Sequence, residues 1–261
     1  IGGLTSFVPR LRDGGAALPP DPVRDEIGEL GAAMRDVAER LASARAEQDR
    51  LLASAAHELR TPLTVLRTEV DLALRKDRSA DELRASLREV RSDLERLGTL
   101  AGALLDLQAV RHIGFEREPG DLVQLAREAC AGLSVVAQTR SVELRVVADG
   151  PAPARFDERT LRQAVDNLIG NALKHTPPHT AVEVSVRRER DRWQLAVADR
   201  GPGVEAEHAD RIFEPFQRFA AGTGAGLGLA IVREVMARHD GRAWLDLDYR
   251  AGARFVVELG P

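Results

Sequence analysis

The chain has 261 residues, a formal net charge of −4 at pH 7 and a sequence pI near 5.9. Hydrophobic residues make up 44% and charged residues 30%, a composition that excludes global disorder. The acidic balance gives no support to nucleic-acid binding, and the single cysteine, Cys130, excludes both an internal disulfide framework and a zinc site built from cysteines.

The N-terminal part begins Ile1-Gly2-Gly3, without an initiator Met or a signal-peptide pattern. No run of about 18 apolar residues predicts a membrane-spanning helix. We therefore expect a piece cut from a longer protein, whose membrane anchors would lie outside this chain. Residues 1–24 are rich in Gly and Pro and cannot form one continuous helix.

Three apolar stripes with heptad spacing follow, and they predict long amphipathic helices. The last two stripes are separated by the polar loop Arg75–Asp81, which predicts an antiparallel helical hairpin. Each stripe is too wide for one partner helix to cover, so we expect a dimeric four-helix bundle. The stripes are Ile27, Leu30, Met34, Val37 and Leu41; Leu52, Ala56, Leu59, Leu63, Leu66, Val70 and Ala73; and Leu83, Leu87, Val90, Leu94, Leu97, Ala101 and Leu104.

The first two stripes are out of phase. Extending the first stripe by heptads predicts that Leu51 and Ala55 are buried, whereas the second stripe uses Leu52 and Ala56. Such an offset changes how helices wind about each other. One interpretation is a junction with two stable registers that passes a movement along the helix; the alternative is a static irregularity.

From Glu116 onward, short strands alternate with helices, which predicts an α/β sandwich of about 140 residues. The fold class expected is therefore multidomain, α and α+β. The predicted strands are Val142–Val147, Val182–Val186, Trp193–Val197 and Arg254–Leu259, and the predicted helices are Leu122–Ala137, Glu158–His175 and Leu227–Arg238.

The segment His57–Leu63 places a histidine beside a carboxylate and a proline within the second predicted helix. His57 lies one residue after the apolar stripe, so its imidazole is expected at the solvent-accessible edge. A neutral imidazole is a nucleophile near pH 7, and Glu58 is placed to accept the other ring proton. Pro62 should bend the helix. A solvated surface histidine is the alternative interpretation.

Asn167, Asn171 and Lys174 have the spacing i, i+4 and i+7, so they share one face of a predicted helix. An asparagine carbonyl suits Mg²⁺, and Lys174 can meet a phosphate. A polar surface face is the alternative, but it does not explain why the asparagines stand among residues typical of a core.

Two glycine-containing segments complete the set of motifs. In Asp199–Gly203 a carboxylate at a strand end can accept a hydrogen bond from an exocyclic amine while the glycines allow close approach. Gly222–Leu229 leads into a helix, where backbone N–H groups favour phosphate. An ordinary turn and a surface loop are the alternatives.

Taken together and in this order, the motifs resemble those of bacterial sensor histidine kinases with a HisKA-type phosphoacceptor helix. His57–Leu63 is similar to their H box, Asn167–Thr176 to the N box and Asp199–Gly203 to the first glycine box. Ile212–Phe216 is similar to the F box and Gly224–Gly228 to the second glycine box. The domains expected are a partial HAMP-like or coiled-coil segment (1–45), a dimerisation and phosphotransfer hairpin (46–113) and an ATP-binding domain (116–261).

The resemblance implies His57 as the phosphorylated residue, Glu58 as its acid–base partner and Thr61 as the residue that holds a water for dephosphorylation. It implies Asn171, with Asn167 in support, as the Mg²⁺ and phosphate contact. The remaining nucleotide contacts that it implies are Lys174, Asp199, Gly201, Gly203, Arg218, Gly224, Gly226 and Gly228.

One feature departs from the family. Only seven residues, Gln217–Thr223, separate the F box from the second glycine box, where most relatives have a longer lid over the nucleotide. Arg218 is the single basic residue in this segment. We therefore expect weaker retention and faster exchange of nucleotide.

The sequence thus predicts a dimeric, ATP- and Mg²⁺-dependent protein-histidine kinase that phosphorylates itself on His57 and passes the phosphoryl group to an aspartate of a response-regulator receiver domain. We expect it to be the cytoplasmic portion of an inner-membrane sensor, attached to the membrane only through segments absent from this chain. The alternatives are a member that acts mainly as a response-regulator phosphatase and a non-enzymatic coiled-coil scaffold.

Overall fold

The computed structural model describes residues 26–75, 79–112, 114–217 and 226–260. Residues 1–25 of the predicted HAMP-like segment, as well as Arg218 and Gly224, lie outside these ranges. The chain divides into two compact units, residues 1–56 and 57–261. None of the helices described is long and apolar enough to cross a membrane.

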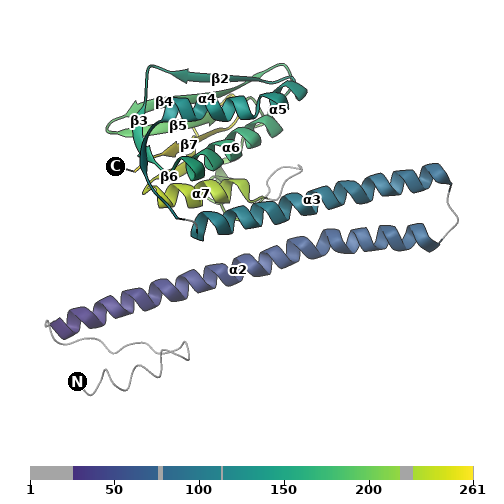
Figure 1. Ribbon diagram of the computed structural model, residues 1–261, viewed down its shortest axis with the longest axis horizontal. Coiled ribbons are helices and arrows are strands. Elements are labelled where there is room, and N and C mark those ends of the chain that lie inside the picture. Colours follow the sequence, from purple (N-terminus) through teal and green to yellow (C-terminus); the bar gives the residue numbers. More distant parts are fainter. Residues whose placement is uncertain (1–25, 76–78, 113, 218–225, 261) are drawn as a thin grey trace. The chain divides into compact units, whose positions relative to one another are not determined.

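Two long helices dominate the N-terminal half (Figure 1). Helix α2 (Glu26–Arg75) is continuous and includes Pro62, whose missing N–H does not end the helix. Helix α3 (Ala80–His112) begins with a capping box, in which Ser79 N–H donates to Glu82 Oε2 at 2.8 Å and Glu82 N–H donates to Ser79 Oγ at 3.3 Å. Residues 57–75 and α3 run antiparallel, as predicted for the hairpin.

The apolar stripe of the first unit is exposed in the single chain. Leu30, Met34, Val37 and Leu41 are each between 48% and 66% exposed. At the junction between the two stripes, Leu51 and Ala55 are buried, whereas Leu52 is 56% exposed.

The predicted stripes of the hairpin correspond largely to an exposed face. Leu63, Leu87 and Leu94 are each more than half exposed, so the partner helix of the same chain leaves these parts of the stripes uncovered. Leu66, which belongs to the predicted stripe of α2, is buried. On α3 the buried residues Leu100, Leu107 and Val110 lie outside the predicted stripe.

The C-terminal part is built on a five-stranded sheet in the order β2-β4-β5-β7-β6. Strands β2 and β4 are parallel, and the other neighbouring pairs are antiparallel. A separate two-stranded sheet pairs β1 with β3 in antiparallel register. The strands are β1 (Glu118–Asp121), β2 (Glu143–Ala148), β3 (Pro153–Phe156), β4 (Ala181–Glu189), β5 (Arg192–Ala198), β6 (Arg242–Leu245) and β7 (Arg254–Glu258).

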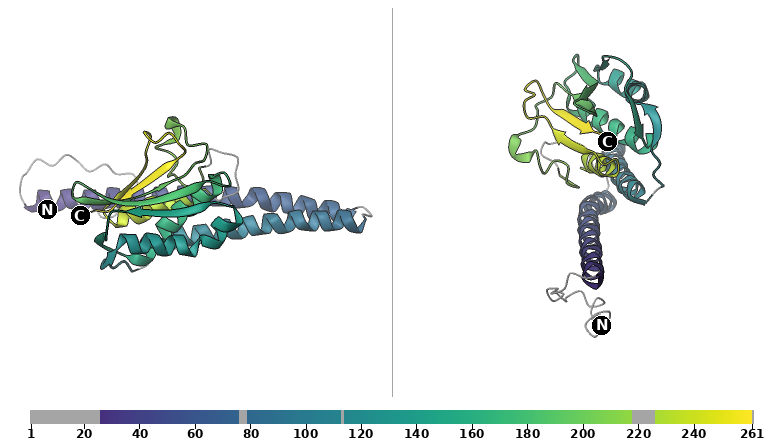
Figure 2. Two further views of the ribbon diagram at one scale, coloured as in Figure 1. Left: turned by 90° about the horizontal axis from the view of Figure 1, so that it is seen from above. Right: turned by 90° about the vertical axis from the view of Figure 1, so that its left-hand side faces the viewer.

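Helices α4 (Leu122–Gly132), α6 (Glu158–His175) and α7 (Gly228–Arg238) cover one face of this sheet (Figures 1 and 2). The core lies between them and the strands, where Leu168, Ile169 and Phe255 are at most 1% exposed. This arrangement confirms the predicted helical region followed by an α/β domain.

Two details of the predicted elements are wrong. The helix expected over Leu122–Ala137 is two helices, α4 and α5 (Ser134–Thr139), because the backbone of Leu133 leaves the helical conformation. Strands β1, β3 and β6 were not predicted. Each has only four residues, too few for an alternating pattern to be visible, and β1 and β3 contain proline.

The end of α3 contacts the α/β domain through α7. Arg111 Nη2 lies 3.1 Å from Glu234 Oε2, with both side chains largely buried. Arg238 donates a hydrogen bond to the carbonyl of Val110, one of the last carbonyls of α3. The second contact gives a partner to a carbonyl that the end of the helix itself leaves without one.

Candidate functional site

Helix α6 carries three of the predicted site residues on one half-exposed face. Asn167, Asn171 and Lys174 alternate with Leu168, Ile169, Ala172 and Leu173, all of which are buried with at most 1% exposure. Asn167 is oriented by a hydrogen bond from its Nδ2 to the carbonyl of Gln163 at 2.9 Å. The two amide groups and the ammonium group therefore line one face of α6, beside its buried residues.

The last turn of α6 meets the loop after β5. A Cβ atom on Gly201 would lie 2.8 Å from the carbonyl oxygen of His175 and 3.1 Å from Asp199 Oδ1. A side chain at this position would separate the two segments, so the first predicted glycine of the loop allows them to touch. Burial lowers the pKa of His175, and the positive charge of Lys174 lowers it further.

Asp199 is the buried carboxylate of the site, only 2% exposed. Its Oδ1 accepts hydrogen bonds from the N–H groups of Gly201 at 2.8 Å and Ala253 at 3.0 Å. Burial raises the pKa of Asp199 above its usual value, and these two hydrogen bonds oppose the rise. Because both bonds use Oδ1, the second oxygen, Oδ2, is left for a donor on a ligand.

The loop between β6 and β7 braces Asp199, and the sequence analysis missed this role. Tyr249 donates its hydroxyl to the carbonyl of Asp199 at 3.2 Å, and Asp199 N–H donates to the carbonyl of Ala253 at 2.8 Å. Gly252 packs so closely that a Cβ atom would lie 2.7 Å from Asp199 Oδ1. In the sequence, the signal for this contact was Gly252, a glycine in the turn before β7.

The second glycine box contacts both the F box and α6. Phe216 N–H donates to the carbonyl of Gly226 at 2.8 Å, and Gly226 has a φ of +67°, which favours glycine. A Cβ atom on Gly228, the first residue of α7, would lie 2.9 Å from Asn167 Oδ1. The start of α7 is therefore adjacent to the asparagine face.

The predicted phosphoacceptor residues lie on a different element, α2. His57 and Thr61 are exposed, and Glu58 is half-buried. Thr61 Oγ1 donates to the carbonyl of His57 at 3.4 Å, a long hydrogen bond that a ligand or a water molecule could replace. His57 is thus accessible to a substrate from solvent.

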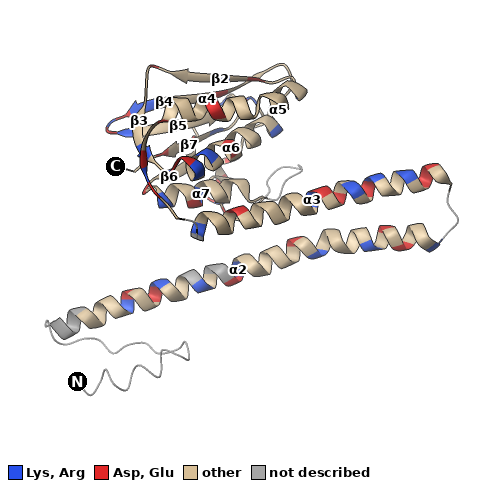
Figure 3. Ribbon diagram, viewed as in Figure 1, with Lys and Arg blue, Asp and Glu red and all other residues tan. Residues whose placement is uncertain are grey.

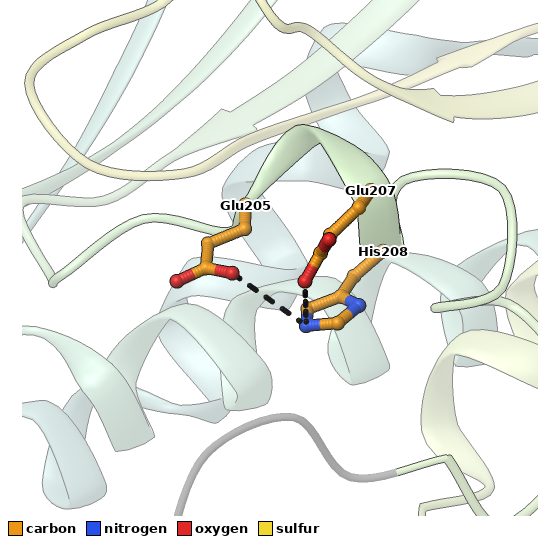
Figure 4. Close-up of side chains that lie close together, drawn as sticks. All are labelled: Glu205, Glu207 and His208. Carbon is orange, nitrogen blue, oxygen red and sulfur yellow. Dashed lines mark ion pairs between the residues drawn. The ribbon is translucent and has the colours of Figure 1, made fainter.

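A further group of ionisable residues stands on the short 3₁₀ helix η2 (Ala206–His208) (Figure 4). His208 Nε2 lies 3.8 Å from a carboxylate oxygen of Glu205 and 3.6 Å from one of Glu207. Potential metal-ligating atoms of the three residues lie within 4.8 Å of one another. Both glutamates are exposed, and such exposed acidic groups are common in proteins that bind no metal there.

The structure therefore brings the N box, both glycine boxes and the F box together around the second half of α6. It does so through contacts of Gly201, Gly226 and Gly228, three of the predicted glycines. Gly203, the other described glycine of the set, has a φ of +78° and lies against the carbonyl of Gly252.

Two family models match the chain. Residues 47–112 match the His Kinase A (phospho-acceptor) domain. Residues 156–261 match the histidine kinase-, DNA gyrase B-, and HSP90-like ATPase family. The chain belongs to the sensor histidine kinase family. Its phosphoacceptor match includes His57, and its ATPase match includes every predicted nucleotide-contact residue.

Curated relatives extend this similarity. The chain is 36% identical over 261 residues to the sensor protein PfeS of Pseudomonas aeruginosa, a match that covers 90% of this chain and 55% of that protein. It is 31% identical over 249 residues to the sensor histidine kinase CusS of Escherichia coli K12, covering 93% of this chain and 52% of that protein. The chain thus spans about half the length of these relatives.

Solved structures share the fold. A structure of full-length ShkA in complex with AMPPNP has 29% identity and a TM-score of 0.58, covering 81% of this chain and 45% of that chain. The histidine kinase ThkA, solved in complex with the response regulator protein TrrA, has 21% identity and a TM-score of 0.68, covering 84% of this chain and 65% of that chain. The latter likeness concerns the fold alone.

Proposed function

We propose that this chain is the kinase portion of a two-component sensor, which phosphorylates itself on His57 with ATP and transfers the phosphoryl group to an aspartate of a response regulator. The observation that carries the proposal is the meeting of four nucleotide-binding motifs around α6 in a chain that also has a phosphoacceptor helix. A non-enzymatic scaffold would have no use for this set of contacts.

In the proposed ATP complex, Asp199 recognises the base. Its Oδ1 is held by two backbone N–H groups, so Oδ2 accepts a hydrogen bond from the exocyclic amine of adenine. The contacts of Gly201 and Gly252 keep the carboxylate in this orientation. The start of α7 at Gly228 offers backbone N–H groups that favour phosphate, and Lys174 adds a positive charge.

The residues present fit a Mg²⁺ ion that accompanies ATP. Asn171 offers a neutral, hard oxygen ligand on the half-exposed face of α6, and Asn167 lies one turn before it. When bound, Mg²⁺ would neutralise part of the negative charge on the phosphates. Asn171 is thus the residue of the protein that would hold the metal ion.

In the proposed phosphoryl transfer, a ring nitrogen of His57 forms a bond to the γ-phosphorus while the bond from that phosphorus to the β–γ bridging oxygen breaks. The products are phosphohistidine and ADP. Glu58, the next residue along α2, accepts the proton from the other ring nitrogen as attack proceeds. Because His57 and Asn171 lie on separate domains, catalysis requires a domain movement that brings them together.

The exposed apolar face of the hairpin supports a homodimer. Leu63, Leu87 and Leu94 are each more than half exposed and recur at helical spacing along α2 and α3. A second copy would cover this face and complete a four-helix bundle. The response-regulator receiver domain would then approach the part of the hairpin around His57, which is exposed to solvent.

The second candidate function is that of a response-regulator phosphatase. The observation that favours it is the pair Glu58 and Thr61, one helical turn apart, with the Thr61 hydroxyl engaged only in a 3.4 Å hydrogen bond. In this function Thr61 would hold the attacking water. The short Gln217–Thr223 segment, with Arg218 as its basic residue, would weaken nucleotide retention and shift the balance toward dephosphorylation.

Because the chain matches only about half of each relative, we also propose that it continues into a HAMP domain and a membrane-embedded sensor region outside this sequence. Under this proposal the present chain is the part on the cytoplasmic side. Fusion of the gene's full reading frame to a reporter that is active on one side of the membrane would test this placement.

The experiment that tests the kinase function is incubation with γ-labelled ATP and Mg²⁺, comparing the parent chain with His57→Gln and with Glu58→Gln. Acid-labile, alkali-stable label on the parent and none on His57→Gln is the expected result. Label that persists on His57→Gln would refute His57 as the acceptor. ATP binding without any label, together with faster loss of phosphate from a phosphorylated regulator, would support the phosphatase function instead.

A further inference from the structure

Arg140 stands at the end of α5, where the chain turns sharply toward β2. Its backbone N–H lies within hydrogen-bonding distance of the carbonyls of Val136 and Ala137, at 3.2 and 3.1 Å. The next residue, Ser141, has a φ of 55° and donates its N–H to the carbonyl of Gln138 at 2.9 Å. These backbone hydrogen bonds therefore fix the position of the Arg140 Cα atom, from which the side chain extends.

The guanidinium group of Arg140 reaches the last turn of α6. Its Nη1 donates to the carbonyls of Leu173 and Lys174, both at 3.4 Å. The last four carbonyls of an α-helix have no partner within that helix, and a cation at this end also interacts favourably with the helix dipole. Arg140 thus supplies, from another element, the partner that these two carbonyls lack in α6.

The last turn of α6 carries predicted site residues. It is contacted by Arg140, which precedes α6 in the sequence, and by Gly201, which follows it. Its residues Lys174 and His175 follow directly on the asparagine face, and the carbonyl of His175 touches Gly201 beside Asp199. Loss of the Arg140 contact would leave the carbonyls of Leu173 and Lys174 without this capping partner, and helix ends without such partners fray.

We propose that Arg140 is a positioning residue for the nucleotide: its guanidinium holds the last turn of α6 so that the Lys174 side chain meets the phosphates of ATP. This inference rests on the proposed ATP-binding function. Arg140 itself touches the backbone of α6 and acts through Lys174, so its removal changes phosphate binding more than base binding.

The test compares Arg140→Met with the parent in the full chain, measuring the dissociation constants of Mg-ATP and of adenosine by calorimetry. The variant loses the two long hydrogen bonds of Arg140, which together contribute about as much free energy as one ordinary hydrogen bond. We therefore expect Mg-ATP to bind about tenfold more weakly. Adenosine, which has no phosphate for Lys174 to meet, is expected to bind as it does to the parent. Arg140→Lys, which keeps the charge but not the forked donor, is expected to lie between the two.

Arg162→Met is the matched control. Arg162 also joins α6 to a neighbouring helix through a carbonyl, donating to Glu128 O at 2.8 Å, and it pairs with Asp166 at 3.0 Å. It lies in the first half of α6, away from Lys174. This variant is expected to lower the thermal midpoint of unfolding while leaving the affinity for Mg-ATP unchanged.

A double variant separates positioning from a direct effect. If Arg140 acts through Lys174, Arg140→Met combined with Lys174→Met binds Mg-ATP no more weakly than Lys174→Met alone. Additive losses, an unchanged ATP affinity in Arg140→Met, or an equal loss of ATP and adenosine would each overturn the inference. Should Arg140→Met fail to fold, Arg140→Lys carries the same comparison. A parent chain that binds no ATP would refute the proposed function instead.

Discussion

The α/β domain covers its large apolar side chains with its own elements, whereas the helical hairpin leaves many of them in solvent. Phe255, Leu161 and Leu168 are at most 1% exposed, while Leu87 and Leu94 of α3 are 66% and 55% exposed. A sheet with helices on one face closes a core within one chain, but two helices enclose only the line between them. The hairpin therefore needs another surface to cover its apolar residues, as does the exposed stripe of the first unit.

The charged residues differ between the two regions in the same way. Basic and acidic residues follow one another along the sequence of α3 (Figure 3), and the side chains of pairs such as Arg84 with Asp81 are highly exposed. In the α/β domain, Glu258 is 4% exposed and accepts hydrogen bonds from Gln194 and Arg242. Burial alone would raise the pKa of Glu258, but these bonds outweigh it and hold the pKa below its usual value.

The largest expected effect comes from replacing a leucine by alanine in each of the two regions. Leu168→Ala leaves a cavity in a closed core and is expected to lower the free energy of unfolding by about 3 kcal/mol or more. Leu87→Ala removes an exposed side chain and is expected to weaken dimerisation instead. Thermal unfolding and analytical ultracentrifugation check the pair; equal loss of stability in both variants would contradict the comparison.

The next effect concerns the nucleotide site. Asp199→Asn keeps the shape of the side chain, but with the carbonyl oxygen held by Gly201 and Ala253, its NH₂ group faces the amine of adenine. We expect ATP affinity to fall by about 100-fold, because the hydrogen bond from the amine to a charged carboxylate is lost and two N–H donors then face each other. The oligomeric state, set by the hairpin, is expected to stay unchanged. Calorimetry and size-exclusion chromatography measure the two properties.

A pH dependence is expected from His239, which is 1% exposed at the end of α7. Its Nδ1 lies 2.8 Å from the carbonyl of Val235, and its Nε2 accepts from Asp157 N–H at 3.1 Å, an arrangement that requires a neutral ring with the proton on Nδ1. Burial lowers the pKa of His239, and among its charged neighbours Arg117 and Arg238 also lower it while Asp157 raises it.

The sign of this dependence follows from proton uptake. Below a pH of about 6.5 the unfolded chain binds a proton at this histidine while the folded chain does not, so stability falls as the pH drops below that value. The slope contributed by one histidine is at most about 1.4 kcal/mol per pH unit. Urea unfolding between pH 7 and 5 is expected to show a shallower loss in His239→Gln. A residual slope is expected from His175, whose pKa is also lowered.

The smallest expected effect distinguishes the two kinds of ion pair. Arg84→Ala removes an exposed pair on α3 and is expected to leave the unfolding free energy unchanged within error. Arg242→Ala removes one partner of the buried Glu258 carboxylate, 3.0 Å away, and is expected to cost about 1 kcal/mol because Gln194 and Arg192 remain. Chemical denaturation of both variants under the same conditions checks the difference.

The sequence by itself determined the elements that depend on local signals. Helix α6 spans Glu158–His175, as predicted, because Asp157 caps its first turn and Thr176-Pro177 ends it. The glycines were readable for a similar reason: Gly226 adopts a positive φ, and Gly201 and Gly228 stand where a Cβ atom would collide. These constraints act within a few residues or exclude every other side chain, so one sequence is enough to read them.

Only the tertiary structure decided which partners those elements find. The brace of Tyr249 and Ala253 on Asp199 crosses about 50 residues of sequence, and the reach of Arg140 to α6 crosses about 33. Local pattern sets which faces are apolar or polar, but the packing of distant segments determines which of those faces meet.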